Sequence, residues 1–337
     1  MAKRQRNRFR AGALILLYHR VTRLSTDPQL LCVTPQHFSE QIEVLKKRVR
    51  PLSLQALVGA SRQRQIPRRA VVVTFDDGYG DNLWNAKAVL EDYDVPATVF
   101  VATGYVGGKR EFWWDEVEKI FLQPGKLPRR LVLDVEGQSK EWDLGTGSDY
   151  SEEQARHFCS WNVTRTETPC ERQDVYRDLC DLLRPLPGKM REELLDRIHA
   201  WAGKESTPRE THRPLNEEEV VAIERDGLIE VGAHTANHTC LSKISVMDQW
   251  HEIAEGKKRL ERVLGHVVKS FSYPYGTVND YSEASVDAVK RAGFSCACSN
   301  FPGLIRGGES LFELPRCIVR DWPGDVFERM LWNWFNE

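Results

Sequence analysis

Residues 70–78 of the chain read Ala-Val-Val-Val-Thr-Phe-Asp-Asp-Gly. The first six form a continuous apolar run rich in β-branched residues, which is typical of a parallel strand covered on both faces. The run passes directly into two aspartates and a glycine, where the chain must turn. Parallel α/β folds place their active sites at this end of their strands. We therefore expect a buried strand that delivers Asp76 and Asp77 to a functional edge, although Asp-Asp-Gly alone is also an ordinary turn.

Helical and strand patterns alternate along most of the chain. After Gly78 the sequence predicts a helix over 84–92 and an apolar strand over 97–102, an order typical of parallel sheets. A second such unit starts at Asn216, where a glutamate three residues later indicates a capping box. The other expected elements are strands at 13–18, 228–232, 267–273, 295–299 and 317–319, and helices over 35–48, 217–226 and 247–264. These patterns predict an α/β fold with a parallel sheet or barrel and helices outside it.

One long segment, residues 109–213, differs in character from the rest. It is polar and rich in Arg, Glu and Asp, so we expect a helical insertion within a main domain that spans 11–337, after a basic N-terminal tail at 1–10. Helical patterns in the insertion are clearest at 176–183 and 191–201. At its start, the aromatic residues 112–114 could line a sugar-binding cleft or simply seat the insertion on the barrel.

The composition excludes several classes of protein. A net charge of −2 over 337 residues gives no reason to expect nucleic-acid binding. The eight cysteines form no Cys-x-x-Cys pair, so a thiolate zinc site is not expected and reduced thiols in the cytoplasm are the simpler interpretation. The apolar run at 11–17 follows basic residues, as in an export signal, but no small-residue cleavage site follows it. We interpret it as a buried strand and expect a cytoplasmic protein, free or membrane-associated, without a transmembrane segment.

Two further clusters of chemically active residues follow predicted strands. His234 and His238 are four residues apart, and on a helix they would share one face and bind one metal ion. Such a pair alone is often a surface coincidence. The third cluster, residues 272–276, reads Ser-Tyr-Pro-Tyr-Gly and breaks a strand into a rigid turn. One carboxylate and two imidazoles form the ligand set of a hydrolytic metal centre, and a second carboxylate beside the first supplies a base.

Together these motifs resemble those of the polysaccharide deacetylases, the NodB-type enzymes of carbohydrate esterase family four. The family's Thr-Phe-Asp-Asp-Gly motif matches 74–78, its His-Ser/Thr-x-x-His motif matches 234–238, and its third motif is similar to 273–276. The resemblance implies a distorted (β/α) barrel of about seven strands. The metal ligands it implies are Asp77, His234 and His238. It further implies Asp76 as general base and the backbone N–H of Tyr275 as an oxyanion donor.

The chain departs from the family pattern in two places. The usual C-terminal Leu-x-His motif is missing, but some circularly permuted relatives carry Tyr-His-x-Val near the N-terminus, and residues 18–21 fit that variant. We therefore assign His19 as the general acid, with a structural histidine as the alternative. The arginine that usually precedes the third motif is also missing. Arg316 could replace it by pairing with Asp76.

The resemblance implies hydrolysis of an N-acyl group, with acetyl expected, from an amino sugar in a glycan or glycoconjugate. Zinc is the expected metal, although an Asp-His-His site also accepts cobalt, nickel or iron. Two alternatives stay open. The same barrel could hydrolyse another non-peptide C–N bond, in a formamide or cyclic ureide, because fold does not fix function. The chain could also be a non-catalytic carbohydrate-binding protein, although such a protein needs neither Asp76 nor His19.

Overall fold

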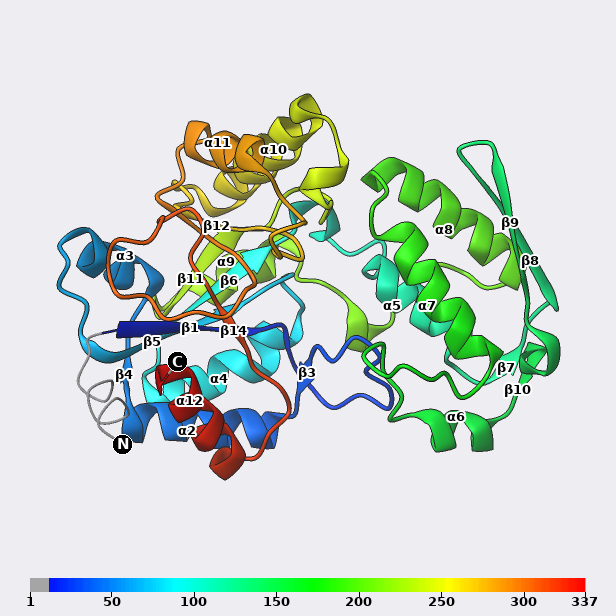
Figure 1. The fold of residues 1–337 in the computed structure, drawn as a ribbon, viewed down its shortest axis with the longest axis horizontal. Helices are drawn as coiled ribbons and strands as arrows, with labels where there is room; N and C mark the ends of the chain where they lie inside the picture. Colours follow the sequence, from blue (N-terminus) through cyan, green and yellow to red (C-terminus); the bar gives the residue numbers. More distant parts are fainter. Residues whose placement is uncertain (1–11, 337) are drawn as a thin grey trace. The chain divides into compact units, whose positions relative to one another are not determined.

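The computed structural model describes residues 12–336, which form two compact units (Figure 1). Within that range, the first unit holds residues 12–23, 31–107 and 214–336, and the second holds 24–30 and 108–213. The predicted basic tail at 1–10 lies outside the described residues.

The first unit is built on a curled parallel sheet. Along the sheet the order is β13-β12-β11-β6-β5-β1-β14, and every neighbouring pair is parallel. These strands are β1 (Gly12–Tyr18), β5 (Arg68–Phe75), β6 (Ala97–Val101), β11 (Ile229–Ala233), β12 (Ser270–Ser272), β13 (Cys296–Cys298) and β14 (Cys317–Ile318). The short β4 (Arg50–Pro51) pairs with β5, and β2 (Arg20–Val21) pairs with β3 (Cys32–Val33). The predicted distorted barrel of about seven strands is confirmed, and all carboxyl ends of its strands lie at one edge.

Some helices of the first unit begin at side-chain caps that the sequence supplies. Thr34 caps α2 (Pro35–Arg48) by accepting a hydrogen bond from the His37 N–H, and Asn216 forms the predicted capping box of α9 (Glu217–Glu224). The remaining α-helices are α3 (Leu54–Arg62), α4 (Lys87–Tyr93), α10 (Val246–Leu264), α11 (Glu283–Arg291) and α12 (Gly324–Asn336). The helix predicted at 84–92 differs from expectation, because it begins as a π-helix, η1 (Asn82–Ala86).

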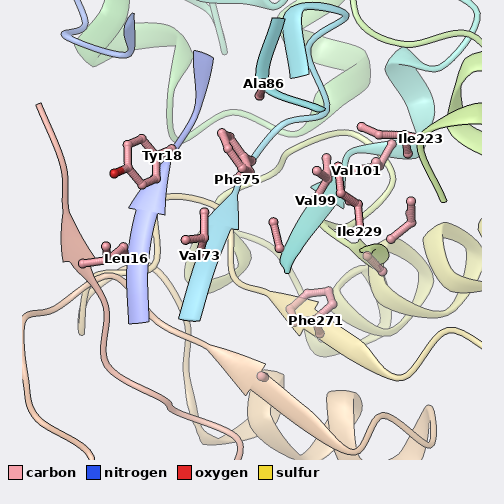
Figure 2. Close-up of a cluster of buried hydrophobic side chains, with 14 of the residues drawn as sticks. Leu16, Tyr18, Val73, Phe75, Ala86, Val99, Val101, Ile223, Ile229 and Phe271 are labelled. Atoms are coloured by element: carbon pink, nitrogen blue, oxygen red, sulfur yellow. The ribbon is translucent and has the colours of Figure 1, made fainter. Parts of the chain in front are cut away.

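The central strands are buried on both faces, as their apolar runs predict. All seven residues of β1 are buried, and β1 pairs with β5 along its whole length. Figure 2 shows Leu16 and Tyr18 on the same side of the sheet as Val73 and Phe75 of β5. The intervening residues of both strands contribute to a second apolar cluster, with α3. The apolar run near the N-terminus is therefore a core strand.

A short segment joins the two ends of the sheet. Leu314 forms a parallel bridge with Cys298 at the end of β13, and its carbonyl accepts a hydrogen bond from the Ser299 N–H at 2.9 Å. The Arg316 N–H donates to the Phe301 carbonyl at 3.0 Å. The next residues form β14, which pairs with β1 at the other end of the sheet. Residues 314–316 therefore close the barrel.

The second unit combines helices with a β-hairpin. Its helices are α5 (Trp113–Phe121), α6 (Glu152–Phe158), α7 (Glu171–Leu183) and α8 (Gly188–Ala202), and the two predicted helical patterns lie within α7 and α8. The hairpin pairs β8 (Arg130–Val135) with β9 (Gln138–Asp143), and β7 (Gly125–Lys126) pairs with β10 (Asp149–Tyr150). The sequence pattern does not predict the hairpin, because β9 is polar and mostly exposed and lacks the alternation that β8 shows.

Two features of the insertion bear on function. Phe112, Trp113 and Trp114 are at most 5% exposed, so their faces are packed and unavailable to a sugar. On the first unit, the residues that flank the insertion meet, because the Gly107 N–H donates to the Leu215 carbonyl at 3.2 Å.

All eight cysteines are free thiols. No helix among residues 12–336 has the length and apolar character needed to cross a membrane.

Candidate metal and hydrolytic site

The two aspartates after β5 point in different directions because of a left-handed turn. The Asp76 N–H continues the ladder by donating to the Tyr18 carbonyl at 3.0 Å. Asp77 then has a φ of 75° and Gly78 a φ of 79°. Aspartate tolerates this region better than most residues. As a result, both carboxylates are buried, but their shortest side-chain contacts are with different residues.

Asp77 lies beside the two imidazoles of the second motif. Its Oδ1 is 3.5 Å from the Nε2 of His234 and 3.3 Å from the Nε2 of His238. The Nδ1 of His234 lies 2.7 Å from the Ser272 carbonyl. A carbonyl only accepts hydrogen bonds, so Nδ1 carries a proton, and Nε2 is the ring nitrogen that faces Asp77.

The two histidines converge through a turn and not through a helix. Residues 235–237 form a turn, with a φ of 63° at Thr235 and of 50° at His238. Residues 234–238 are therefore not helical, which was the condition under which the two imidazoles were expected to share one face. The ring centroids of His234 and His238 are nevertheless only 4.8 Å apart. The turn brings the rings together by backbone conformation rather than by helical periodicity.

Helix α10 supports this turn through hydrogen bonds and close packing. Glu252 accepts hydrogen bonds at 2.8 Å from both the backbone N–H and the side-chain amide of Asn237, and its carbonyl accepts from the Ala236 N–H at 2.9 Å. Gly256 lets the helix approach closely, since a Cβ there would lie 2.8 Å from the Thr235 carbonyl carbon. The sequence does not indicate a role for either residue, because nothing in a helical pattern marks which face of the helix meets a distant turn.

Asp76 forms a buried bidentate ion pair with Arg316. The guanidinium Nη1 and Nη2 each lie 2.7 Å from one carboxylate oxygen, and Nη2 also donates to the Ser272 hydroxyl at 2.8 Å. Burial raises the pKa of Asp76, but the charge and hydrogen bonds of Arg316, together with the charges of His234 and His19, outweigh burial, and the net shift is downward. Asp76 is therefore ionised, and its Oδ2 lies 3.9 Å from the Nε2 of His234. Arg316 makes the contact proposed for it.

His19 follows β1 at the same edge of the sheet. Burial lowers its pKa, and the negative charges of Asp77 and Asp76, which raise it, do not compensate fully. The Asn82 side-chain amide donates to the His19 carbonyl at 2.8 Å. The next residue, Arg20, pairs with the buried Asp81 at 3.0 Å. The segment that carries His19 is thus fixed to the chain that follows the first motif.

Tyr275, in the third motif, lies beside His238. Its ring packs edge-to-face on His238, with centroids 4.7 Å apart, and its backbone has a φ of 61°. The Asn300 side-chain amide donates to the Tyr275 carbonyl at 2.9 Å, and the Asn300 N–H donates to the Gly276 carbonyl at 2.7 Å. Asn300, which the sequence did not single out, therefore holds the turn of the third motif.

The donor set of Asp77, His234 and His238 fits a divalent metal ion. Their ligand atoms all lie within 4.8 Å of one another. Among residues 12–336, no group donates a hydrogen bond to the buried Asp77 Oδ1. Two atoms bound at 2.0–2.2 Å to one tetrahedral zinc are about 3.4 Å apart, and the carboxylate–imidazole separations of 3.3 and 3.5 Å match this value.

Comparison with known proteins identifies similar sequences in one family. A family model described as polysaccharide deacetylase matches residues 63–126 and 198–297. These segments contain both aspartates, both imidazoles and Tyr275, but neither His19 nor Arg316. Poly-beta-1,6-N-acetyl-D-glucosamine N-deacetylase of Staphylococcus aureus is 30% identical over 121 residues, which cover 32% of this chain and 42% of that protein. The same-named protein of Staphylococcus epidermidis is 33% identical over 109 residues, covering 28% and 38%.

The chain thus matches only about two fifths of the length of these curated relatives. Solved structures resemble it over nearly the whole length. The Streptococcus pyogenes deacetylase PplD, in complex with acetate, aligns with a TM-score of 0.59 at 16% identity, covering 96% of this chain and 99% of that one. IcaB from Ammonifex degensii aligns with a TM-score of 0.59 at 18% identity, covering 97% and 98%. At these identities the structural likeness establishes the fold.

Replacing Gly256 by alanine should lower the free energy of unfolding by about 1–3 kcal/mol and weaken zinc binding. The added methyl group would push α10 away from the turn that carries the two histidines. Urea unfolding and the zinc content after dialysis measure the two effects. Gly59→Ala in α3 is the matched control, because no atom lies within 4 Å of its added Cβ, and it should stabilise by up to about 1 kcal/mol. Equal effects of the two substitutions would contradict this account of α10.

Replacing Arg316 by methionine should cost about 3–5 kcal/mol at pH 7, because Asp76 then remains buried without its cation. In the native protein the lowered pKa of Asp76 contributes stability above the unfolded pKa of about 3.9, and this contribution is lost as pH falls. In the variant, burial raises the pKa of Asp76. The difference in unfolding free energy between the two proteins should therefore shrink as pH falls from 7 to 4.

The control for this experiment is Arg329→Met, which removes the exposed pair with Asp325. It should leave stability nearly unchanged at both pH values. A difference between native protein and Arg316→Met that stays constant across the pH range would show that Asp76 is not the group that Arg316 stabilises.

Proposed function

The chain is a NodB-type member of the polysaccharide deacetylase family, and from this membership we propose that it hydrolyses the N-acetyl group of an amino sugar in a glycan or glycoconjugate. The observation that carries the proposal is the pairing of a three-residue metal site with a separate ionised carboxylate. Asp77, His234 and His238 would hold the metal, while Asp76 faces the same space with its charge fixed by Arg316. A carbohydrate-binding protein needs a metal site at most, whereas a hydrolase also needs the base.

In the proposed reaction, water attacks the carbonyl carbon of the acetamide and the C–N bond breaks, which yields acetate and a free amine. A divalent cation, when bound, supplies Lewis-acid polarisation of the carbonyl and lowers the pKa of the attacking water. Asp76 accepts the proton of the water, and the bidentate contact with Arg316 keeps its oxygens oriented. The Tyr275 N–H donates to the developing oxyanion.

His19 delivers a proton to the departing nitrogen in this scheme. Burial lowers the pKa of the imidazole, so its resting form is neutral near pH 7, and it must carry a proton when the amine leaves. The negative charges of Asp77 and Asp76 favour protonated His19. They would therefore stabilise the imidazolium that forms during turnover. Zinc is the metal we propose, because two imidazoles and one carboxylate suit it.

Acetate release from N-acetylglucosamine oligosaccharides should require both the bound metal and the base Asp76, and the two requirements can be tested separately. We expect chelated protein to be inactive and zinc to restore it. His238→Ala should lose both zinc and activity. Asp76→Asn should retain about one zinc per chain while activity falls about 10²–10⁴-fold. Acetate assays together with zinc analysis of each protein measure these outcomes.

His266→Ala is the matched control for His238→Ala, because His266 is exposed and pairs with Glu224. It should keep both zinc and activity. Release of formate, or opening of a cyclic ureide, in place of acetate would assign the chain to the alternative C–N hydrolases. Oligosaccharide binding without any turnover, in protein that contains zinc, would favour a binding role.

His19→Gln should separate the acid role from a structural one. An amine leaves only when protonated, so deacetylation of the amide should fall about 10²–10⁴-fold. A nitrophenolate leaves without a proton, so hydrolysis of 4-nitrophenyl acetate by the same variant should change little. Equal losses on amide and ester, with a lowered melting temperature, would identify His19 as a structural residue.

A further inference from the structure

The imidazole of His19 lacks the partner that usually orients an acid–base histidine. Such a ring is ordinarily directed by a hydrogen bond to one of its nitrogens. Among residues 12–336, no group forms a hydrogen bond with either ring nitrogen of His19, whereas its backbone carbonyl accepts one. The charges of Asp77 and Asp76 act on the ring through space. The position of the imidazole therefore depends on the backbone that carries it.

That backbone is held on both sides of the imidazole. On the side of β1, the Tyr18 carbonyl accepts a hydrogen bond from the Asp76 N–H at 3.0 Å. On the other side, the His19 carbonyl accepts from the side-chain amide of Asn82 at 2.8 Å. Asn82 is only 1% exposed, so water does not compete for this contact. One buried side chain thus fixes the peptide group that follows the His19 Cα.

Asp81, the neighbour of Asn82, holds the next two residues of the same segment. Its Oδ1 accepts from the Val21 N–H at 2.8 Å, and its Oδ2 lies 3.0 Å from the Nε of Arg20. The Arg20 guanidinium also lies over the ring of Tyr79, 4.2 Å from its centroid. Asp81 and Arg20 are both buried, and buried charges persist when they are paired. The segment after His19 is therefore fixed to the chain that follows the first motif.

The π-helix η1 begins at the residue that contacts His19. A second asparagine of η1, Asn85, donates to the Val21 carbonyl at 2.7 Å. π-Helical turns are rare and frequently occur at functional sites. Asn82 opens this turn, so the irregular backbone and the contact with His19 occur at the same place.

From these contacts we propose that Asn82, supported by Asp81, is a positioning residue that holds the His19 imidazole where it can protonate the departing nitrogen. This inference rests on the proposed function and adds a residue to its proton-delivery step. Asn82 touches no reacting atom and acts through the backbone of His19. A displacement of about 1 Å can cost about 10²-fold in rate, so loss of this contact should affect proton delivery. Metal binding, which uses other residues, should not change.

The test measures amide and ester hydrolysis by Asn82→Ala. The variant should lower kcat for deacetylation of N-acetylglucosamine oligosaccharides about 10–10²-fold, with little change in KM or in zinc content. Hydrolysis of 4-nitrophenyl acetate should change by less than about two-fold, because its leaving group needs no proton. In the His19→Gln background, Asn82→Ala should lower deacetylation no further, since its effect passes through His19.

Asn85→Ala is the matched control. Asn85 belongs to the same π-helix and also donates to a backbone carbonyl, but to that of Val21, two residues after His19. It should change the ratio of amide to ester turnover by less than about two-fold. A loss equal to that of Asn82→Ala would show that η1 has a structural role only.

Asp81→Asn is the second variant, and it serves if Asn82→Ala does not fold. It keeps an oxygen for the Val21 N–H but removes the negative charge that pairs with Arg20. The ratio of amide to ester turnover should fall in this variant too, with zinc retained.

An unchanged ratio of amide to ester turnover in Asn82→Ala and Asp81→Asn would overturn the inference, and so would a further loss in the His19→Gln background. NMR of protein with ¹³C-labelled histidine keeps the test independent of turnover, because the ring resonance of His19 is identified by its absence from His19→Gln. If the native protein releases no acetate, the proposed function fails. The positioning role is then still supported by a shifted His19 resonance in Asn82→Ala with those of His234 and His238 unchanged. An unchanged His19 resonance refutes it.

Discussion

The bidentate ion pair between Arg316 and Asp76 is the contact on which the site and the barrel both depend. Arg316 belongs to the segment that joins the two ends of the sheet, and its guanidinium reaches from there to the carboxyl end of β5 and to Ser272 of β12. Its Nε also donates to the Ser299 carbonyl after β13 at 2.7 Å. Four parts of the barrel thus meet at one cation, whose full burial would be costly without these partners.

The same edge of the sheet concentrates backbone strain. Asp77, Thr235, His238 and Tyr275 are not glycines, yet all four have positive φ. Each such residue costs of order 1–3 kcal/mol and persists only where the surroundings enforce it. Here Glu252, Gly256 and Asn300 provide that enforcement through hydrogen bonds and close approach. The site is therefore held in its geometry before a ligand arrives.

The sequence predicted the strands well and pointed to acidic and imidazole residues that the fold brings together, because these signals are local. A β-branched run identifies β5 wherever it lies, and Asp76 and Asp77 follow it directly. The contact between Arg316 and Asp76 spans 240 residues of sequence, so only an analogy with the missing arginine suggested it. The turn at 235–237 and the π-helix at 82–86 were missed because their backbone conformations are imposed by tertiary contacts. Trp84 was assigned to an ordinary helix for the same reason.

The hydrogen bond between Gly107 and Leu215 holds the two ends of the insertion next to each other. Because the two ends of the insertion are joined by a hydrogen bond on the barrel, the path from β6 to α9 is already closed without the residues between them. Closing a longer excursion between fixed ends costs only about 0.6 kcal/mol for each doubling of its length. The barrel therefore tolerates large changes at this one point. A segment of another length can take its place there while the strands that carry the site keep their order.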